Sequence, residues 1–174
     1  PLSDHFVFNN LDDQSWENIF IDTENFLKKC REINLKQSVI KHDINKILFF
    51  DKLVCRLKEF TNTTNIKWNK DFKINGTYFK SLKKIVNDIE TILYNLPKTQ
   101  TFMHGDFCFS NIIYESRLKR IFIIDPRGSY NSDYSTNLGS FIYDRCKFYH
   151  SIYGLYDFIV QGMFSLKTLS SYEF

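Results

Sequence analysis

Two neighbouring stretches of the sequence decide the fold that we predict. HGDFCFSNIIY spans residues 104–114, and IFIID follows at residues 121–125 after the polar connection ESRLKR. Two short apolar runs joined in this way predict an antiparallel β-hairpin. Because a hairpin brings its outer ends together, the loop before its first strand and the residue that ends its second strand emerge on one side. Asp106, Asn111 and Asp125 are therefore expected to face the same space.

These three side chains suit phosphoryl transfer, a reaction that depends on positioning and on neutralisation of charge. Mg²⁺ prefers oxygen ligands, and Asp125 supplies a carboxylate while Asn111 supplies an amide oxygen. Asp106 would then accept the proton of an attacking hydroxyl, a general-base role worth about 10²–10⁴ in rate. An Asp, an Asn five positions later and an apolar strand ending in Asp match the catalytic loop and the metal-binding Asp of kinases in order and spacing.

The same stretches resemble the aminoglycoside phosphotransferase and choline kinase superfamily, whose members share the protein-kinase fold. The likeness rests on HGDFCFSNIIY, on IFIIDPRG at residues 121–128 and on YDRCKFYHSIYGLYDF at residues 143–158, and it covers roughly residues 100–158. In particular, the wording resembles phosphotransferase-family proteins associated with bacterial capsule and surface-polysaccharide genes. The resemblance implies transfer of the γ-phosphoryl group of ATP, with Mg²⁺, to a hydroxyl of a sugar, an aminoglycoside, a choline-like alcohol or a capsule precursor.

The resemblance also implies a role for individual residues of this sequence. Asp106 matches the catalytic base, and Asn111 and Asp125 match the two metal ligands. His104 matches a structural histidine that braces the catalytic loop, and Asp144 matches a helical Asp that steadies the same loop.

The sequence departs from the family before these motifs. Family members begin with a β-sheet lobe that clamps the nucleotide with a loop and a Lys. Here the first glycine is Gly76, and no strand–turn–strand pattern with a Lys precedes the first expected helix. We therefore expect residues 1–174 to form a single helical C-terminal lobe, with the nucleotide-clamping lobe of the same protein as its partner.

Three further residues are candidates for contact with phosphate or substrate. Arg127 could reach a phosphate, or it could pair with a nearby acid. Lys147 and His150 share an expected helix with Asp144 at intervals of three residues, so Lys147 could instead pair with Asp144 on the surface.

Hydrophobic periodicity places helices around the hairpin. After an extended segment at residues 1–11, a helix capped by Asp12 or Asp13 is expected to end near residue 32. Further helices are expected at about 43–60, capped by Asp43, at about 77–96, and from about 140 to Gly154. Short strands are expected at 101–103 and 111–114, and loops at 61–65 and 126–139. The last twenty residues are expected to be helical or irregular. The predicted fold class is α+β and mainly helical, a kinase-like C-terminal lobe whose small hairpin carries the catalytic and metal loops.

The composition narrows the classes of partner and location. The net charge is +3, and no basic block exceeds three residues, so a nucleic-acid partner is not indicated. No apolar run approaches the roughly 18 residues of a membrane span. The four Cys form no CxxC motif and no secretory signal opens the chain, a pattern that favours reduced thiols and a cytoplasmic location.

Two other functions remain open from the sequence. One is a non-catalytic binding module with a kinase-like lobe. The other is a two-metal phosphodiester hydrolase that would use Asp106, Asp125 and Asp144 as a carboxylate set, although that chemistry has no need for Asn111.

Overall fold

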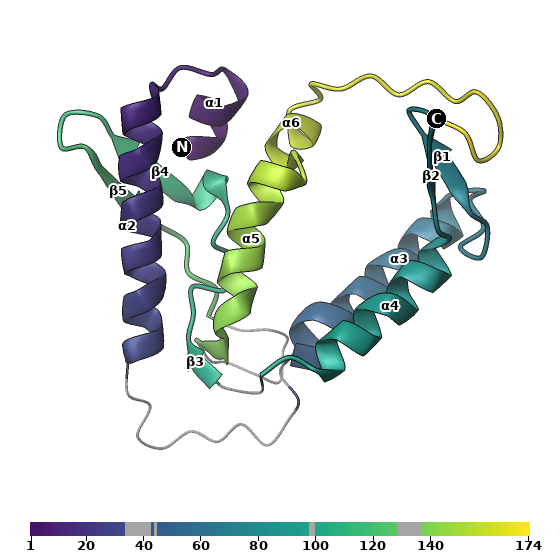
Figure 1. Cartoon of the computed structure of the whole chain (residues 1–174), viewed down its shortest axis with the longest axis horizontal. Helices are drawn as coiled ribbons and strands as arrows, with labels where there is room; N and C mark the ends of the chain where they lie inside the picture. The colour runs from purple at the N-terminus through teal and green to yellow at the C-terminus, as the bar shows by residue number, and fades with distance from the viewer. Residues whose placement is uncertain (34–42, 44, 98–99, 129–136) are drawn as a thin grey trace. The chain divides into compact units, whose positions relative to one another are not determined.

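The computed structural model describes residues 1–33, 43, 45–97, 100–128 and 137–174, which form an α+β fold that is mainly helical (Figure 1). The chain divides into two compact units. The first unit combines Pro1–His42 with Thr99–Phe164, and the second combines Asp43–Lys98 with Ser165–Phe174. Among the helices of the described residues, none is long and apolar enough to cross a lipid bilayer.

Helices of the first unit enclose an aromatic core. They are α1 (Leu2–Val7), α2 (Asp13–Glu32), α5 (Phe141–Tyr153) and α6 (Tyr156–Val160), with a 3₁₀ turn η2 (Phe109–Asn111). The Asp12 side chain caps α2 by accepting the N–H of Ser15 at 2.8 Å, so this cap and the helix end near residue 32 are confirmed. Gly154 ends α5, also as predicted, and a Cβ there would lie 2.6 Å from the His150 carbonyl oxygen.

The extended segment predicted for residues 1–11 is wrong, because Leu2–Val7 form helix α1. Leu2 is fully buried, and α1 packs against η2, β4 and α6. A six-residue helix has little stability of its own, so tertiary packing rather than local propensity holds it in place.

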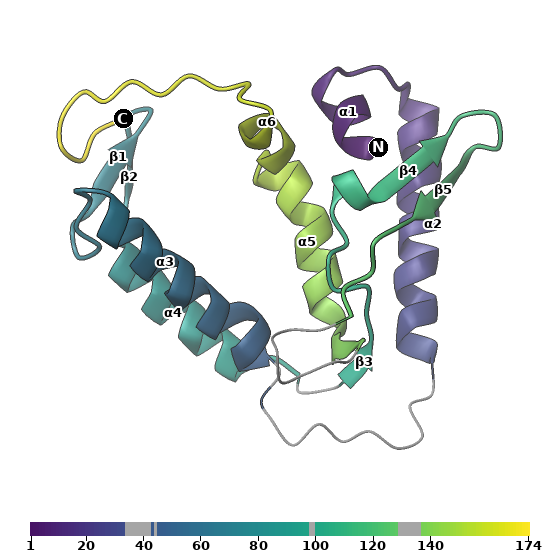
Figure 2. The same ribbon diagram turned by 180° about the vertical axis from the view of Figure 1, so that it is seen from behind.

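The predicted hairpin is confirmed. Strand β4 (Ile112–Glu115) pairs antiparallel with β5 (Arg120–Ile123), and Ile112 lies opposite Ile123. The hairpin lies beside α2 in both Figure 1 and Figure 2. It therefore brings the segment before β4 and the segment after β5 to the same end.

A second antiparallel pair replaces part of the loop predicted at 126–139. Strand β3 (Gln100–Phe102) pairs with β6 (Leu138–Ser140), and Thr101 lies opposite Gly139. The sequence of β6 has no alternating apolar pattern, so its strand form depends on a partner distant in the chain. Residues 129–136 of that predicted loop lie outside the described residues.

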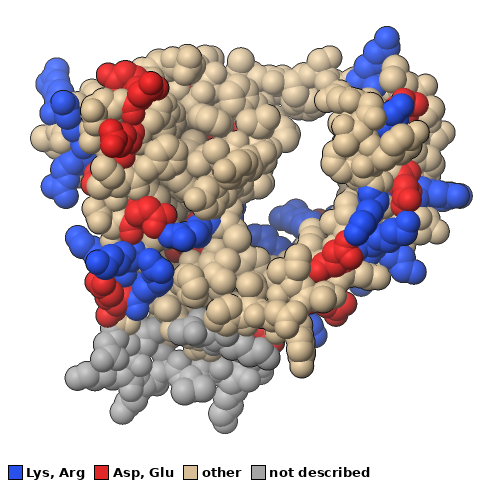
Figure 3. Space-filling view, in the orientation of Figure 1, with Lys and Arg blue, Asp and Glu red and all other residues tan. Residues whose placement is uncertain are grey.

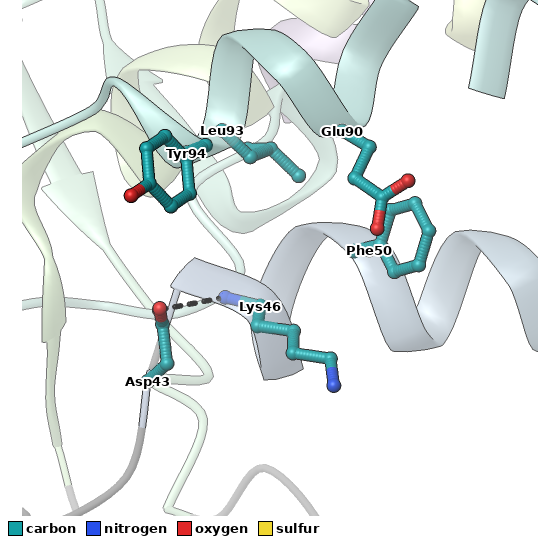
Figure 4. A pocket seen from close by; sticks show the side chains of 6 residues that line it. All are labelled: Asp43, Lys46, Phe50, Glu90, Leu93 and Tyr94. Atoms are coloured by element: carbon teal, nitrogen blue, oxygen red, sulfur yellow. Dashed lines mark hydrogen bonds between the residues drawn. The ribbon is translucent and has the colours of Figure 1, made fainter. Parts of the chain in front are cut away.

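The second unit contains a helical pair and a hairpin. A π-helical segment η1 (Lys46–Asp51) continues into α3 (Lys52–Thr63), and α4 (Leu82–Tyr94) packs against η1. The Asp43 carboxylate accepts the N–H of Lys46 at 3.1 Å, beside a hollow of about 120 Å³ that Glu90 also lines (Figure 4). Helix α3 continues into the loop predicted at 61–65, so that loop begins later than expected.

The helix predicted for 77–96 is wrong at its start. Strand β1 (Phe72–Ile74) and strand β2 (Thr77–Phe79) form a hairpin instead, and α4 begins only after Ser81. Its turn is Asn75–Gly76, where both residues have positive φ, as a two-residue hairpin turn requires. Stacking of Phe72 on Phe79 at 5.5 Å adds to the pairing. The Asn-Gly turn outweighed the helical periodicity that begins at Phe79.

The C-terminal segment adds to this hairpin. The N–H of Lys73 donates to the Tyr172 carbonyl at 2.8 Å, and the N–H of Phe174 donates to the Lys73 carbonyl at 2.9 Å. On the face drawn in Figure 3, basic side chains are interspersed with acidic ones rather than gathered on one element.

Candidate functional site

The loop between β3 and β4 is anchored in the core of the first unit. Phe107 and Phe109 are fully buried, and both rings contact Phe148 of α5. Phe107 also stacks on Phe26 of α2 at 5.1 Å. The two buried rings therefore fix the backbone that directly follows the predicted catalytic residue, Asp106.

Gly105 gives the loop its turn. Its φ of +82° lies in the left-handed region, and a Cβ there would lie 2.9 Å from the Cβ of Arg127. The N–H of Arg127 donates to the His104 carbonyl at 2.7 Å. Glycine thus allows the loop before β4 to pack directly on the loop after β5.

His104 ties the same two loops together through its ring. Nε2 lies 2.8 Å from the Ile124 carbonyl oxygen, which can only accept, so Nε2 carries the hydrogen. Nδ1 accepts the N–H of Asp106 at 3.3 Å. With 3% of its surface exposed and both ring nitrogens engaged, His104 has the contacts of a bracing residue.

Asp144 holds the loop from α5. Its carboxylate accepts the N–H groups of His104 at 2.6 Å and Gly105 at 2.8 Å, and only 1% of its surface is exposed. Burial is the largest influence and raises the pKa of this carboxyl, while the two N–H groups favour its charged form. Asp144 therefore does not form the surface pair with Lys147 that was one of the two alternatives.

Asp106 lies among donors from three different segments. Lys147 Nζ lies 2.9 Å from Oδ1, and an Arg127 guanidinium nitrogen lies 3.7 Å from the same oxygen. The Asn111 amide donates to Oδ2 at 3.3 Å and to the Asp106 carbonyl at 2.9 Å. Burial of Lys147 opposes its charge, but the hydrogen bond and the charge of Asp106 outweigh burial and raise the pKa of the ammonium. The Asp106 side chain keeps 30% of its surface exposed, so an incoming group can reach it.

Asn111 and Asp125, the predicted metal ligands, lie on two segments that one backbone hydrogen bond joins. The N–H of Ile124 donates to the Asn111 carbonyl at 3.0 Å, and Asp125 follows directly with a φ of +54° and an exposed side chain. Asp tolerates this left-handed conformation better than most residues. One amide oxygen and one carboxylate fit Mg²⁺, which proteins commonly hold with one or two carboxylates plus substrate phosphates. Within the described residues, no cluster of three or more His, Cys, Asp or Glu side chains could hold a metal by itself.

His150 is in contact with an aromatic ring of α6. Its ring lies 4.4 Å from the ring of Tyr156, and partial burial followed by the charge of Lys147 lowers its pKa. The described contacts join Asp106 to Lys147, Arg127 and Asn111, but they do not include His150.

Two contributors to the site were not singled out from the sequence. The Gly105 turn had a local signal, since a glycine between His and Asp suggests a special backbone conformation. Ser151 had none: its hydroxyl accepts the N–H of Phe109 at 3.3 Å, a contact that depends on how α5 packs. A search of the chain against family models, curated proteins and solved structures gave no match.

Proposed function

We propose that this chain carries the catalytic and metal-binding loops of an ATP- and Mg²⁺-dependent phosphotransferase that acts on a hydroxyl of a small molecule. One observation supports this most: a partly exposed carboxylate, Asp106, lies on a braced loop beside Asn111 and two cations. The acceptor class is that of sugars, aminoglycosides, choline-like alcohols and capsule precursors, as the sequence resemblance implies.

Asp106 acts as the general base in this proposal. It would orient the acceptor hydroxyl and take its proton as the oxygen attacks phosphorus. The ion pair with Lys147 and the amide of Asn111 restrict the rotamer of the carboxylate, so one oxygen direction is favoured. Such positioning is a large part of catalysis, because a misplacement of about 1 Å can cost about 100-fold in rate.

Asn111 and Asp125 would hold Mg²⁺, which neutralises phosphate charge when it is bound. Arg127 lies beside Asp106 and would meet a phosphate oxygen when an acceptor reaches the carboxylate. His104 and Asp144 would act at a distance from the substrate, by keeping the loop in one conformation.

The finer structural proposals follow from the same resemblance. Residues 1–174 would form the kinase-like C-terminal lobe, and a nucleotide-clamping lobe of the same protein would complete the ATP site. The enzyme would work in the cytoplasm, where ATP is abundant and the four thiols, none of them in a disulfide, stay reduced.

The hydrolase alternative loses support from the position of Asp144. Its two oxygens accept backbone N–H groups inside the protein, so it is poorly placed to complete a carboxylate set with Asp106 and Asp125. The binding-module alternative is compatible with the same contacts around Asp106, but it predicts no phosphoryl transfer.

The test is acceptor-dependent release of ADP by the full-length gene product with Mg²⁺-ATP and a panel of sugars, aminoglycosides, choline and ethanolamine. We expect Asp106→Asn to lower turnover by about 10²–10⁴ while the protein stays folded. Asp88→Asn is the matched control, since Asp88 pairs with Lys80 on the surface of the second unit.

Wild-type turnover by Asp106→Asn would refute the assignment of the base. Absence of ADP release with every acceptor, together with measurable binding of Mg²⁺-ATP, would favour the binding module. Cleavage of a phosphodiester without nucleotide would restore the hydrolase.

A further inference from the structure

The second unit contains an apolar cavity of about 430 Å³. Its walls come from the end of α3, from β1 and from the C-terminal segment, and they include Phe60, Phe72, Ile74 and Leu166. The volume falls in the range of about 300–1,000 Å³ that small-molecule sites occupy, and such sites combine apolar walls with a few polar groups.

Backbone hydrogen bonds hold the walls together. The C-terminal segment bonds to the backbone N–H and the carbonyl of Lys73, through the Tyr172 carbonyl at 2.8 Å and the Phe174 N–H at 2.9 Å. An ion pair between Lys73 and Glu173 at 2.7 Å joins the same two segments. These contacts hold the C-terminal segment against β1, so tertiary structure fixes the shape of the cavity.

The charged side chains at this cavity are both basic. Of the described side chains that line it, those of Lys67 and Lys70 carry a charge, and both residues are exposed. Three nearby lysines are already paired: Lys73 with Glu173, Lys80 with Asp88 and Lys84 with Asp71. Among the described residues, no ion pair is found for Lys67 or Lys70. An anionic group placed beside them would gain attraction without displacing a protein carboxylate.

We propose that this cavity binds a medium-chain carboxylate, with its hydrocarbon chain inside and its carboxylate at Lys67 and Lys70. The cavity of about 430 Å³ corresponds to about 14 groups of the size of a water molecule at about 30 Å³ each, enough for a chain of about ten carbons. Tyr172 also lines the cavity, and its hydroxyl accepts the N–H of Lys67 at 3.3 Å, which leaves its hydrogen to donate.

Calorimetric titration of the full-length gene product with decanoate, below the concentration at which it forms micelles, tests the site. Decyltrimethylammonium has the same chain and the opposite charge, so we expect it to bind more weakly than decanoate. The double variant Lys67→Gln/Lys70→Gln should weaken decanoate binding about 2- to 30-fold, the range expected for two exposed charge pairs. The control Lys80→Gln removes a lysine outside the cavity wall and should leave the affinity unchanged.

A second variant tests the cavity itself. Leu166 is 66% exposed, so Leu166→Trp should fold normally while its larger ring fills the space, and decanoate binding should be lost. Equal affinity for both amphiphiles, unchanged binding by the lysine double variant, or no binding of decanoate by the wild type would each overturn the proposal. The cavity uses no residue of the loop that carries Asp106, so these outcomes are independent of the phosphotransferase assay.

Discussion

Replacement of Asp144 by Ala should expose how strongly one buried carboxylate holds the candidate catalytic loop. Asp144 accepts two backbone N–H groups, from His104 at 2.6 Å and from Gly105 at 2.8 Å, and it is 1% exposed. A buried donor that loses its partner costs about 1–3 kcal/mol, so two such donors cost about 2–6 kcal/mol. Removal of a buried charge returns part of this cost, as the raised pKa of Asp144 indicates. We therefore expect a loss of about 2–4 kcal/mol in the free energy of unfolding.

Urea unfolding followed by circular dichroism measures this loss, and amide hydrogen exchange locates it. Exchange at His104 and Gly105 should accelerate more than exchange along α2. Asp144→Asn keeps one acceptor but turns an amide NH₂ toward the other donor, so its loss should be intermediate. The control Asp88→Ala removes an exposed pair with Lys80 and should cost less than about 1 kcal/mol. A loss for Asp144→Ala no larger than that of the control, with unchanged exchange in the loop, would refute the reasoning.

Three other substitutions give distinct expected outcomes. Gly105→Ala should lower the free energy of unfolding in urea by about 1–3 kcal/mol, because φ is +82° and the new Cβ would meet a side chain at 2.9 Å. At Gly128 a Cβ would meet nothing within 4 Å, so the control Gly128→Ala should be near neutral. The pairing with Asp106 raises the pKa of Lys147 above its ordinary 10.5. The stability that the pair contributes is therefore present below that pH and is lost as the pH rises through the pKa of the folded state. Lys147→Met should make the free energy of unfolding fall less steeply at alkaline pH, and an unchanged slope would contradict the pairing. Burial raises the pKa of Asp157 above 3.8, so ionisation of this carboxyl costs stability as the pH rises through the pKa of the folded state. The Tm of Asp157→Asn should therefore equal that of the wild type in acid and exceed it near neutral pH. A lower Tm at neutral pH would contradict this.

The elements that the sequence predicts correctly are those with a strong local signal. Asp12 caps α2 because its side chain is within reach of the Ser15 N–H, and no distant residue is needed. The β4–β5 hairpin likewise depends on two short apolar runs and a polar connection. The misses have non-local causes: α1 is held by packing, and β6 depends on its pairing with β3. The β1–β2 hairpin is the exception, since its Asn75–Gly76 turn was readable in the sequence.

The same division applies to the candidate site. Local sequence determined the order and spacing of Asp106, Asn111 and Asp125, and the hairpin between them brings their segments to one end. Only the tertiary structure decided that Lys147 pairs with Asp106 and that Asp144 turns inward to the loop backbone. On a helix alone, two opposite charges three residues apart are natural partners. Packing of α5 against the loop changes this, because two buried N–H groups take Asp144 as their acceptor while the Lys147 ammonium finds its counter-ion in Asp106.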